Sequence, residues 1–191
     1  MSEQMHSCPE EELLRLARLL DQAALTELYD RYNDRIYYYS LRLLGDSSLA
    51  EDCAADTFSR LLRALRDGGG PVDNLKAYLF RSAHNWIADH YRRTTPLPLE
   101  AEIDVLQADS NPAEEAEQNL IQGRVRRALR LLTPDQQQVM ALRFIEGWEL
   151  DEIAECLRKP LGAVKALQHR AVAALRKMLL EEEMRNYELQ T

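Results

Sequence analysis

The sequence has few of the residues that interrupt helices. Glycine and proline each occur only seven times among 191 residues, and most of them separate segments rich in helix-forming residues. No segment alternates strictly between apolar and polar residues, as a half-buried strand does. Together, the scarcity of helix breakers and the missing strand pattern predict an all-α protein.

Cysteine and long apolar runs are scarce as well. Cys8, Cys53 and Cys156 form an odd and widely spaced set, which argues against a disulfide framework. No apolar run approaches the ~18 residues of a membrane-spanning helix, and the N-terminus has no basic-then-apolar signal pattern. We therefore expect a cytoplasmic protein that does not insert into a membrane.

A converging set of catalytic or metal-binding residues is also missing. His84 and His90 are six residues apart, so on one helix they point to different sides. The glycines at 68–70 lack the Lys-Ser/Thr that completes a phosphate-binding loop. Cys53 and Cys156 lie in amphipathic segments, which is typical of packed thiols. We expect no enzyme activity, no metal site and no cofactor.

The net charge of −8 is unusual for a nucleic-acid-binding protein, but its distribution is uneven. Residues 96–123 contain seven acidic residues and no basic residue, whereas residues 124–180 contain 11 basic and six acidic residues. The pattern predicts a near-neutral helical domain at 1–95, an acidic linker at 96–123 that includes the start of the next helix, and a basic domain at 124–191 with an acidic tail. Weak intrinsic affinity for DNA follows.

Two short turns divide the stretch from Thr133 to Met178 into three expected helices. Thr133 and Gln136 have the spacing of a capping box. Gly147 suits a left-handed helix end, and Pro160 can end one helix and begin the next. The last two of these helices form a candidate helix-turn-helix.

The last helix is expected to span Leu161 to Met178 with one apolar stripe. That stripe includes Val164 and Ala171, whereas Lys165 and His169 fall outside it, where a DNA groove could be met. The plainer interpretation is a packed helix with a solvated basic face.

A second unusual helix is expected over residues 74–93, capped by Asp73 and preceded by the glycine-rich loop. It interleaves four aromatic residues with basic and amide residues. Such a mixture can stack on unpaired bases and follow phosphates. The alternative is that the aromatic residues are core and the basic ones a solvated face, and this alternative holds for some of them.

Three blocks follow one another along the chain: residues 28–32 with 50–58, residues 78–93, and residues 152–154 with 160–165 and 169–171. In this order, and with the acidic linker, they resemble the extracytoplasmic-function (ECF) group of the sigma-70 family. Members of this family are the promoter-specificity subunits of bacterial RNA polymerase. The resemblance implies a factor that binds core polymerase, recognises the −35 and −10 promoter elements and promotes promoter opening. It also implies an anti-sigma partner.

The resemblance implies roles for three groups of residues. Contacts to the −10 region are expected from Asn74, Arg81, His84, Asn85, Asp89, Arg92 and Arg93. Contacts to the −35 region are expected from Leu161, Ala163, Lys165, Ala166, His169 and Arg170. Polymerase contacts are expected from Asp52, Ala55, Phe58, Leu61 and Leu62. The acidic linker would enter the polymerase channels; its alternative is a plain solubilising tether.

The sequence departs from the family pattern at some positions. Leu167 and Gln168 stand where the family often has Arg followed by Leu, so an altered −35 preference is expected. Two other function classes stay open: a stand-alone helix-turn-helix regulator with 1–95 as a dimerisation or sensor unit, and a protein that binds another helical partner.

Overall fold

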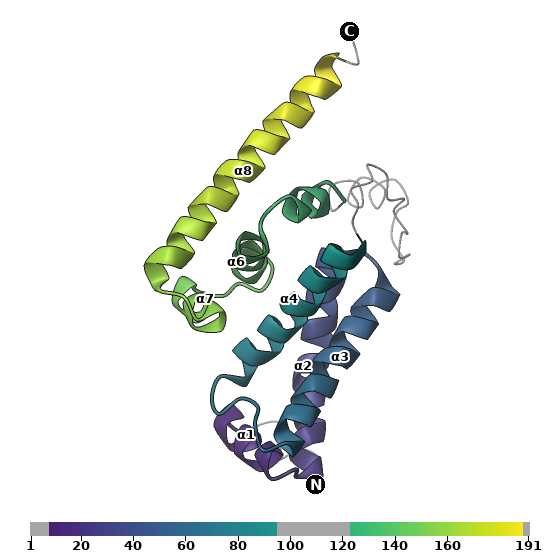
Figure 1. The fold of residues 1–191 in the computed structure, drawn as a ribbon, viewed down its shortest axis with the longest axis vertical. Coiled ribbons are helices and arrows are strands. Elements are labelled where there is room, and N and C mark those ends of the chain that lie inside the picture. The colour runs from purple at the N-terminus through teal and green to yellow at the C-terminus, as the bar shows by residue number, and fades with distance from the viewer. Residues whose placement is uncertain (1–7, 95–122, 189–191) are drawn as a thin grey trace. The chain divides into compact units, whose positions relative to one another are not determined.

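Every regular element among the described residues is a helix. The computed structural model describes residues 8–94 and 123–188, apart from the side chains of 179 and 181–188, and contains no strand in those ranges. The chain divides into two compact units, Met1–Thr95 and Pro96–Thr191 (Figure 1). The predicted all-α class is therefore confirmed. No helix in the described ranges is both long and apolar enough to cross a membrane.

The first unit consists of four helices. They are α1 (Glu10–Arg18), α2 (Gln22–Leu44), α3 (Ser47–Arg66) and α4 (Leu75–Thr94). Helix α2 packs against α3 and α4, and the shorter α1 packs against α2 and α3. The apolar stripes of these helices meet in one core, whose largest fully buried side chains include Ile36, Tyr39, Leu43, Phe80 and Ile87.

Side-chain caps define where three of these helices begin. The carboxylate of Asp21 accepts a hydrogen bond from the Ala24 amide at 2.9 Å. Asp46 caps α3 in the same way. At α4 the expected cap was wrong: the helix begins at Leu75, and Asn74, not Asp73, accepts from the Ala77 amide at 3.0 Å. Asn74 has a φ of 42°, a left-handed conformation that asparagine tolerates better than most residues.

The second unit contains the predicted helix-turn-helix. Residues 123–130 are helical, followed by α6 (Pro134–Phe144), α7 (Leu150–Leu157) and α8 (Leu161–Glu188). These three helices pack against one another. The capping box is confirmed: the Gln136 amide donates to the Thr133 hydroxyl, and the Thr133 amide donates to the Gln136 side chain at 3.1 Å. Gly147 has the expected left-handed φ of 71°.

The expected end of the last helix was wrong. Helix α8 continues past Met178 to Glu188, because the added segment contains no glycine or proline and consists mainly of good helix formers. The predicted acidic linker at 96–123, including the start of the next helix, lies outside the described residues except for Gly123.

Candidate nucleic-acid and partner interfaces

Four polar residues form a line along α4. Arg81, Asn85, Asp89 and Arg92 recur at spacings of four, four and three residues, which places them on one helical face. Asn85 and Arg92 are exposed, and Arg81 and Asp89 are half-buried. The opposite face is buried in the core. This polar line therefore offers amide and guanidinium donors to a ligand outside the unit.

One member of the line is already paired with another. The Arg92 guanidinium forms an ion pair with the Asp89 carboxylate, three residues earlier on the same helix. Both groups are substantially exposed, so the pair adds little to stability. It does reduce the net positive charge of the line, which leaves Arg93, exposed at the end of α4, as a further cation for phosphates.

His84 does not belong to this surface. It is 2% exposed, and its Nδ1 lies 2.9 Å from the hydroxyl oxygen of Tyr39. The predicted DNA contact by His84 conflicts with this burial, because a ligand outside the unit cannot reach the ring. The sequence held a signal for this: residues 80, 83, 84 and 87 follow helical spacing, and His84 interrupts an otherwise apolar stripe.

A stacked aromatic pair on α4 was not among the expected site residues. The rings of Trp86 and His90 stack with their centroids 5.4 Å apart and their planes 6° from parallel. Both residues are partly exposed, and their four-residue spacing was a visible sequence signal. Flat aromatic surfaces of this kind suit stacking against unpaired bases.

The loop between α3 and α4 is held at two carbonyl groups. Nη1 of Arg18, at the end of α1, donates to the carbonyl oxygen of Gly69 at 3.2 Å and to that of Pro71 at 3.0 Å. Gly68 and Gly70 have left-handed φ values of 76° and 84°, where a side chain is strained. A Cβ on Gly70 would also lie 3.1 Å from a methyl group of Leu65. The loop backbone thus has a defined course.

An apolar hollow of about 320 Å³ lies between α2 and α3. Phe58 and Leu61 lie in its wall but are themselves 6% and 2% exposed, whereas Leu62 is 45% exposed. The ring of Tyr29 packs against Phe58 with centroids 4.9 Å apart and is 47% exposed. Of the expected polymerase contacts, Leu62, Asp52 and Ala55 therefore present the accessible atoms. Tyr29, which was not in the expected set, joins them.

Helix α8 presents its first turns in the expected way. Exposed residues on this part of the helix are Leu161, Lys165, Ala166, His169 and Arg170, and Ala163 is half-buried. Val164 and Ala171 are buried on the opposite side. The Arg170 guanidinium donates to the Ala166 carbonyl oxygen at 3.2 Å, so this side chain folds back along its own helix. Lys165 is therefore a better-placed cation for base edges.

Comparison with known proteins assigns both units to one family. Residues 28–96 match Sigma-70 region 2, and residues 128–177 match Sigma-70, region 4. The chain is 31% identical over 170 residues to the ECF RNA polymerase sigma factor SigW of Bacillus subtilis, covering 83% of this chain and 90% of SigW. The chain belongs to the ECF group of RNA polymerase sigma factors.

Other relatives agree with this assignment. The ECF sigma factor BldN of Streptomyces coelicolor is 31% identical over 90% of this chain, which spans 66% of BldN. Among solved structures, CnrH in complex with the cytosolic domain of CnrY is 25% identical, with a TM-score of 0.66, over 89% of this sigma factor and 96% of CnrH. RpoE of Bartonella quintana, bound to NepR, has a TM-score of 0.56 at 22% identity over 81% of this sigma factor and 95% of RpoE, and shares the fold.

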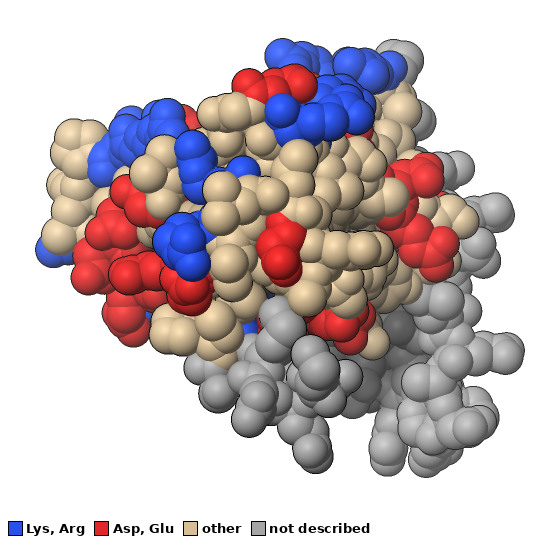
Figure 2. Space-filling model, turned by 90° about the horizontal axis from the view of Figure 1, so that it is seen from below, with Lys and Arg blue, Asp and Glu red and all other residues tan. Residues whose placement is uncertain are grey.

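The charge pattern of this sigma factor is mixed. On the face that Figure 2 shows, Lys and Arg form groups that alternate with acidic and uncharged residues, without one continuous basic field.

Among the described residues, no group of three or more His, Cys, Asp and Glu side chains is arranged to hold a metal ion. The burial of Cys53 raises the pKa of its thiol to about 11, so it is a packed, protonated group.

Proposed function

We propose that this sigma factor binds core RNA polymerase and directs it to promoters by reading the −10 and −35 elements with α4 and α8, without catalysing a reaction itself. The observation that carries the proposal is the exposure of Asn85. Its neighbours Ala83, His84 and Ile87 are buried, whereas Asn85 is exposed on the same helix that carries the stacked Trp86–His90 pair. An exposed amide, on a helix that also exposes a flat aromatic surface, suits an extruded base.

Extruding a base costs a few kcal/mol, so a protein that captures one needs hydrogen-bond partners for it. Asn85 has both a donor and an acceptor in its amide. The loop at 68–74 would form the other side of the pocket, and Arg92 and Arg93 would contact phosphates of the adjoining duplex. Asn74 caps α4 through its Oδ1 atom. We therefore assign Asn74 primarily to shaping the loop, and we leave His84 out of the contact surface.

On α8, Lys165 would approach base edges in the major groove, with His169 and Arg170 nearer the backbone. The exposed surface around Leu62 and Tyr29 would dock on core polymerase, because it offers exposed apolar atoms, and Asp52 adds an exposed carboxylate nearer the start of α3. We also propose an anti-sigma factor as a partner and the cytoplasm as the location. These proposals rest on family membership and on the exposed surfaces described above.

Run-off transcription with purified core polymerase on a promoter library, followed by transcript sequencing, tests the proposal. We expect specific transcripts only when the sigma factor and core polymerase are both present. On the selected promoter, Asn85→Ala should reduce open complexes at least about tenfold without weakening polymerase binding. The matched control is Asn33→Ala, which deletes an amide side chain on α2 and should behave as the wild type.

The main alternative, a stand-alone regulator, makes the opposite prediction. It would bind a specific duplex tightly without polymerase, and Asn85→Ala would not affect strand opening. Tight specific duplex binding by the purified protein, with no stimulation of core polymerase, would therefore replace the proposal.

A further inference from the structure

Helix α1 lies before the residues that match the sigma-70 regions, yet it contacts the loop that the proposed function places beside the −10 base. The contact is made by Arg18 in the last turn of α1. Its Nη1 donates hydrogen bonds to two loop carbonyl groups, those of Gly69 and Pro71. Carbonyl groups outside helices need such partners, so Arg18 restricts the loop backbone at two positions.

The other end of α1 contacts the other end of the loop segment. The Glu10 carboxylate accepts a hydrogen bond from the Lys76 amide at 3.3 Å, in the first turn of α4. A carboxylate at this position also interacts favourably with the helix N-terminus. Glu10 and Arg18 are eight residues apart, about 12 Å along the helix axis. Helix α1 therefore runs antiparallel to residues 69–76 and is hydrogen-bonded to that segment at both ends.

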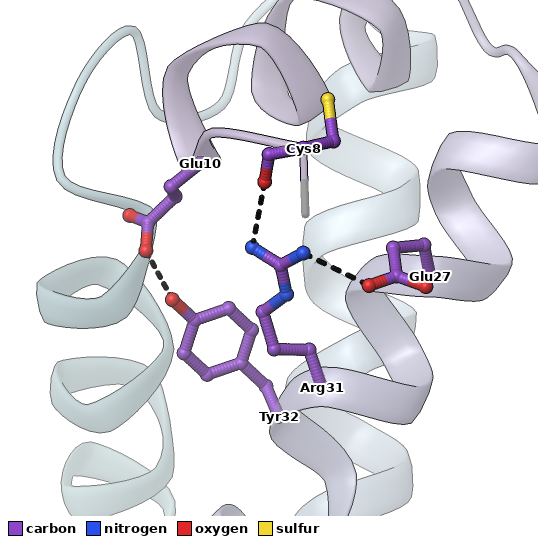
Figure 3. A network of polar contacts seen from close by, with 5 residues as sticks. All are labelled: Cys8, Glu10, Glu27, Arg31 and Tyr32. Atoms are coloured by element: carbon purple, nitrogen blue, oxygen red, sulfur yellow. Dashed lines mark hydrogen bonds and ion pairs between the residues drawn. The ribbon is translucent and has the colours of Figure 1, made fainter. Parts of the chain in front are cut away.

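Helix α1 is itself fixed to α2. The second oxygen of the Glu10 carboxylate accepts a hydrogen bond from the Tyr32 hydroxyl, as Figure 3 shows. In the same view, the Arg31 guanidinium donates one hydrogen bond to the Cys8 carbonyl oxygen, at 3.2 Å, and another to the Glu27 carboxylate, at 2.9 Å. Burial, together with the hydrogen bond to Glu10, raises the pKa of Tyr32 well above its usual range, so the phenol remains a donor.

Apolar packing completes the attachment. Leu13, Leu14 and Ala17 of α1 are buried, which fixes the roll of the helix and aims Arg18 at the loop. The loop itself contains three left-handed residues, Gly68, Gly70 and Asn74. Glycines lower the cost of that course but also leave many alternatives open to the free chain. A contact from outside the loop is needed to select one of them.

We propose that α1 holds the 68–74 loop in one backbone conformation. Arg18 is then a positioning residue for base discrimination at the −10 element, although it does not touch DNA. The inference rests on the proposed function, because it assigns the loop to the base pocket. Polymerase docking uses the separate surface around Leu62 and Tyr29. Loss of Arg18 should therefore affect base discrimination and leave polymerase affinity unchanged.

The test uses the full chain with core polymerase on the promoter selected by run-off transcription and on a set of single-base changes in its −10 element. The measured quantity is the ratio of open-complex yield on the preferred base to that on each substituted base. Arg18→Ala should lower this ratio about fivefold or more, the scale of one lost hydrogen bond. Polymerase affinity, measured in the same preparations, should stay within about twofold.

Two variants separate positioning from a general loss of structure. Arg18→Lys keeps a long cationic donor and should recover part of the ratio. Arg15→Ala removes an arginine from the same helix that pairs only with Glu12 in the described contacts, and should leave the ratio unchanged. Hydrogen exchange supplies an independent readout: in Arg18→Ala, amides in 68–74 should exchange faster while those of α2 keep their protection.

The outcomes distinguish the inference from the function beneath it. If Asn85→Ala impairs opening but Arg18→Ala keeps the full discrimination ratio, the positioning role of α1 and Arg18 is wrong and the proposed function stands. If Asn85→Ala leaves both opening and discrimination intact, the base pocket itself is wrong. An Arg18→Ala protein that loses polymerase affinity and α2 protection along with discrimination would show a general structural role and overturn the positioning assignment.

Discussion

The Nδ1 atom of His84 lies 2.9 Å from the Tyr39 hydroxyl oxygen, in the core between α2 and α4. Tyr39 is completely buried and His84 is 2% exposed. The Tyr39 ring also packs edge-on against Phe80, with centroids 5.2 Å apart. This pair therefore connects the helix that carries the Asn85 surface to α2 by a buried polar contact.

Replacing Tyr39 with phenylalanine should destabilise the first unit. The substitution keeps the ring but removes the hydroxyl, and the imidazole then loses that partner inside the core. A loss of about 1–3 kcal/mol in the free energy of unfolding is expected. Urea unfolding in a Trp148→Phe background measures it, because Trp86 then remains as the single tryptophan and reports on this unit. Tyr38→Phe, at a 55% exposed position, should change the free energy by less than about 0.5 kcal/mol.

The stability of the first unit should fall at alkaline pH because of Cys53. Burial raises the pKa of its thiol to about 11, whereas the pKa of a thiol in the unfolded chain is about 8.5. The unfolded state therefore loses its proton first, and the stability present below about pH 8.5 is lost as the pH rises toward 11. The expected maximum slope from this group is about −1.4 kcal/mol per pH unit.

The same tryptophan signal tests this pH dependence under reducing conditions. Between about pH 8.5 and 10, Cys53→Ala should show a flatter decline than the parent protein, whatever its absolute stability. Tyrosine side chains of the unfolded chain begin to titrate in the same window, but they do so in both proteins, so the difference between the two slopes reports on Cys53. Equal slopes in the two proteins would show that Cys53 does not contribute.

Local sequence signals predicted those parts of the fold that depend on neighbouring residues. The Thr133–Gln136 capping box and the left-handed Gly147 need only a few residues to form. At the start of α4, two adjacent residues were both good caps. The structure uses Asn74 rather than Asp73, and Asn74 takes a left-handed φ that asparagine tolerates.

Contacts between distant segments could not be predicted from the sequence. Arg18 and the Gly69 carbonyl group are 51 residues apart, and nothing local in either segment indicates their hydrogen bond. His84 was misplaced for a different reason. Its residue type suggested a polar surface, whereas its position on the 80–83–87 stripe indicated burial, and the packing of α4 followed the stripe. The exposure of Asn85 and Lys165 agreed with the periodicity.

Leu62 should contribute to the proposed polymerase contact without supporting the fold. It is 45% exposed at the edge of the hollow between α2 and α3. Leu62→Asp should weaken core polymerase binding about tenfold or more, since it places a charge in a desolvated apolar contact. Binding to labelled core polymerase measures the effect. Leu131→Asp, at a 60% exposed leucine of the other unit, is the matched control and should bind nearly as the parent does. Equal affinity for the two variants would place the polymerase surface elsewhere.

Lys165 should contribute to −35 discrimination through base edges rather than through charge alone. It is exposed near the start of α8, one residue after the buried Val164, which fixes the helix rotation. Lys165→Ala should reduce discrimination between the selected −35 sequence and single-base variants by about 1–3 kcal/mol at one position. Lys177→Ala removes the same charge from an exposed position three turns further along α8 and should weaken all sequences equally, if at all. Competition between promoter variants in transcription with core polymerase measures both effects. A uniform loss across all −35 variants in Lys165→Ala would make this lysine a phosphate contact, because only a base-edge contact changes the ranking of sequences.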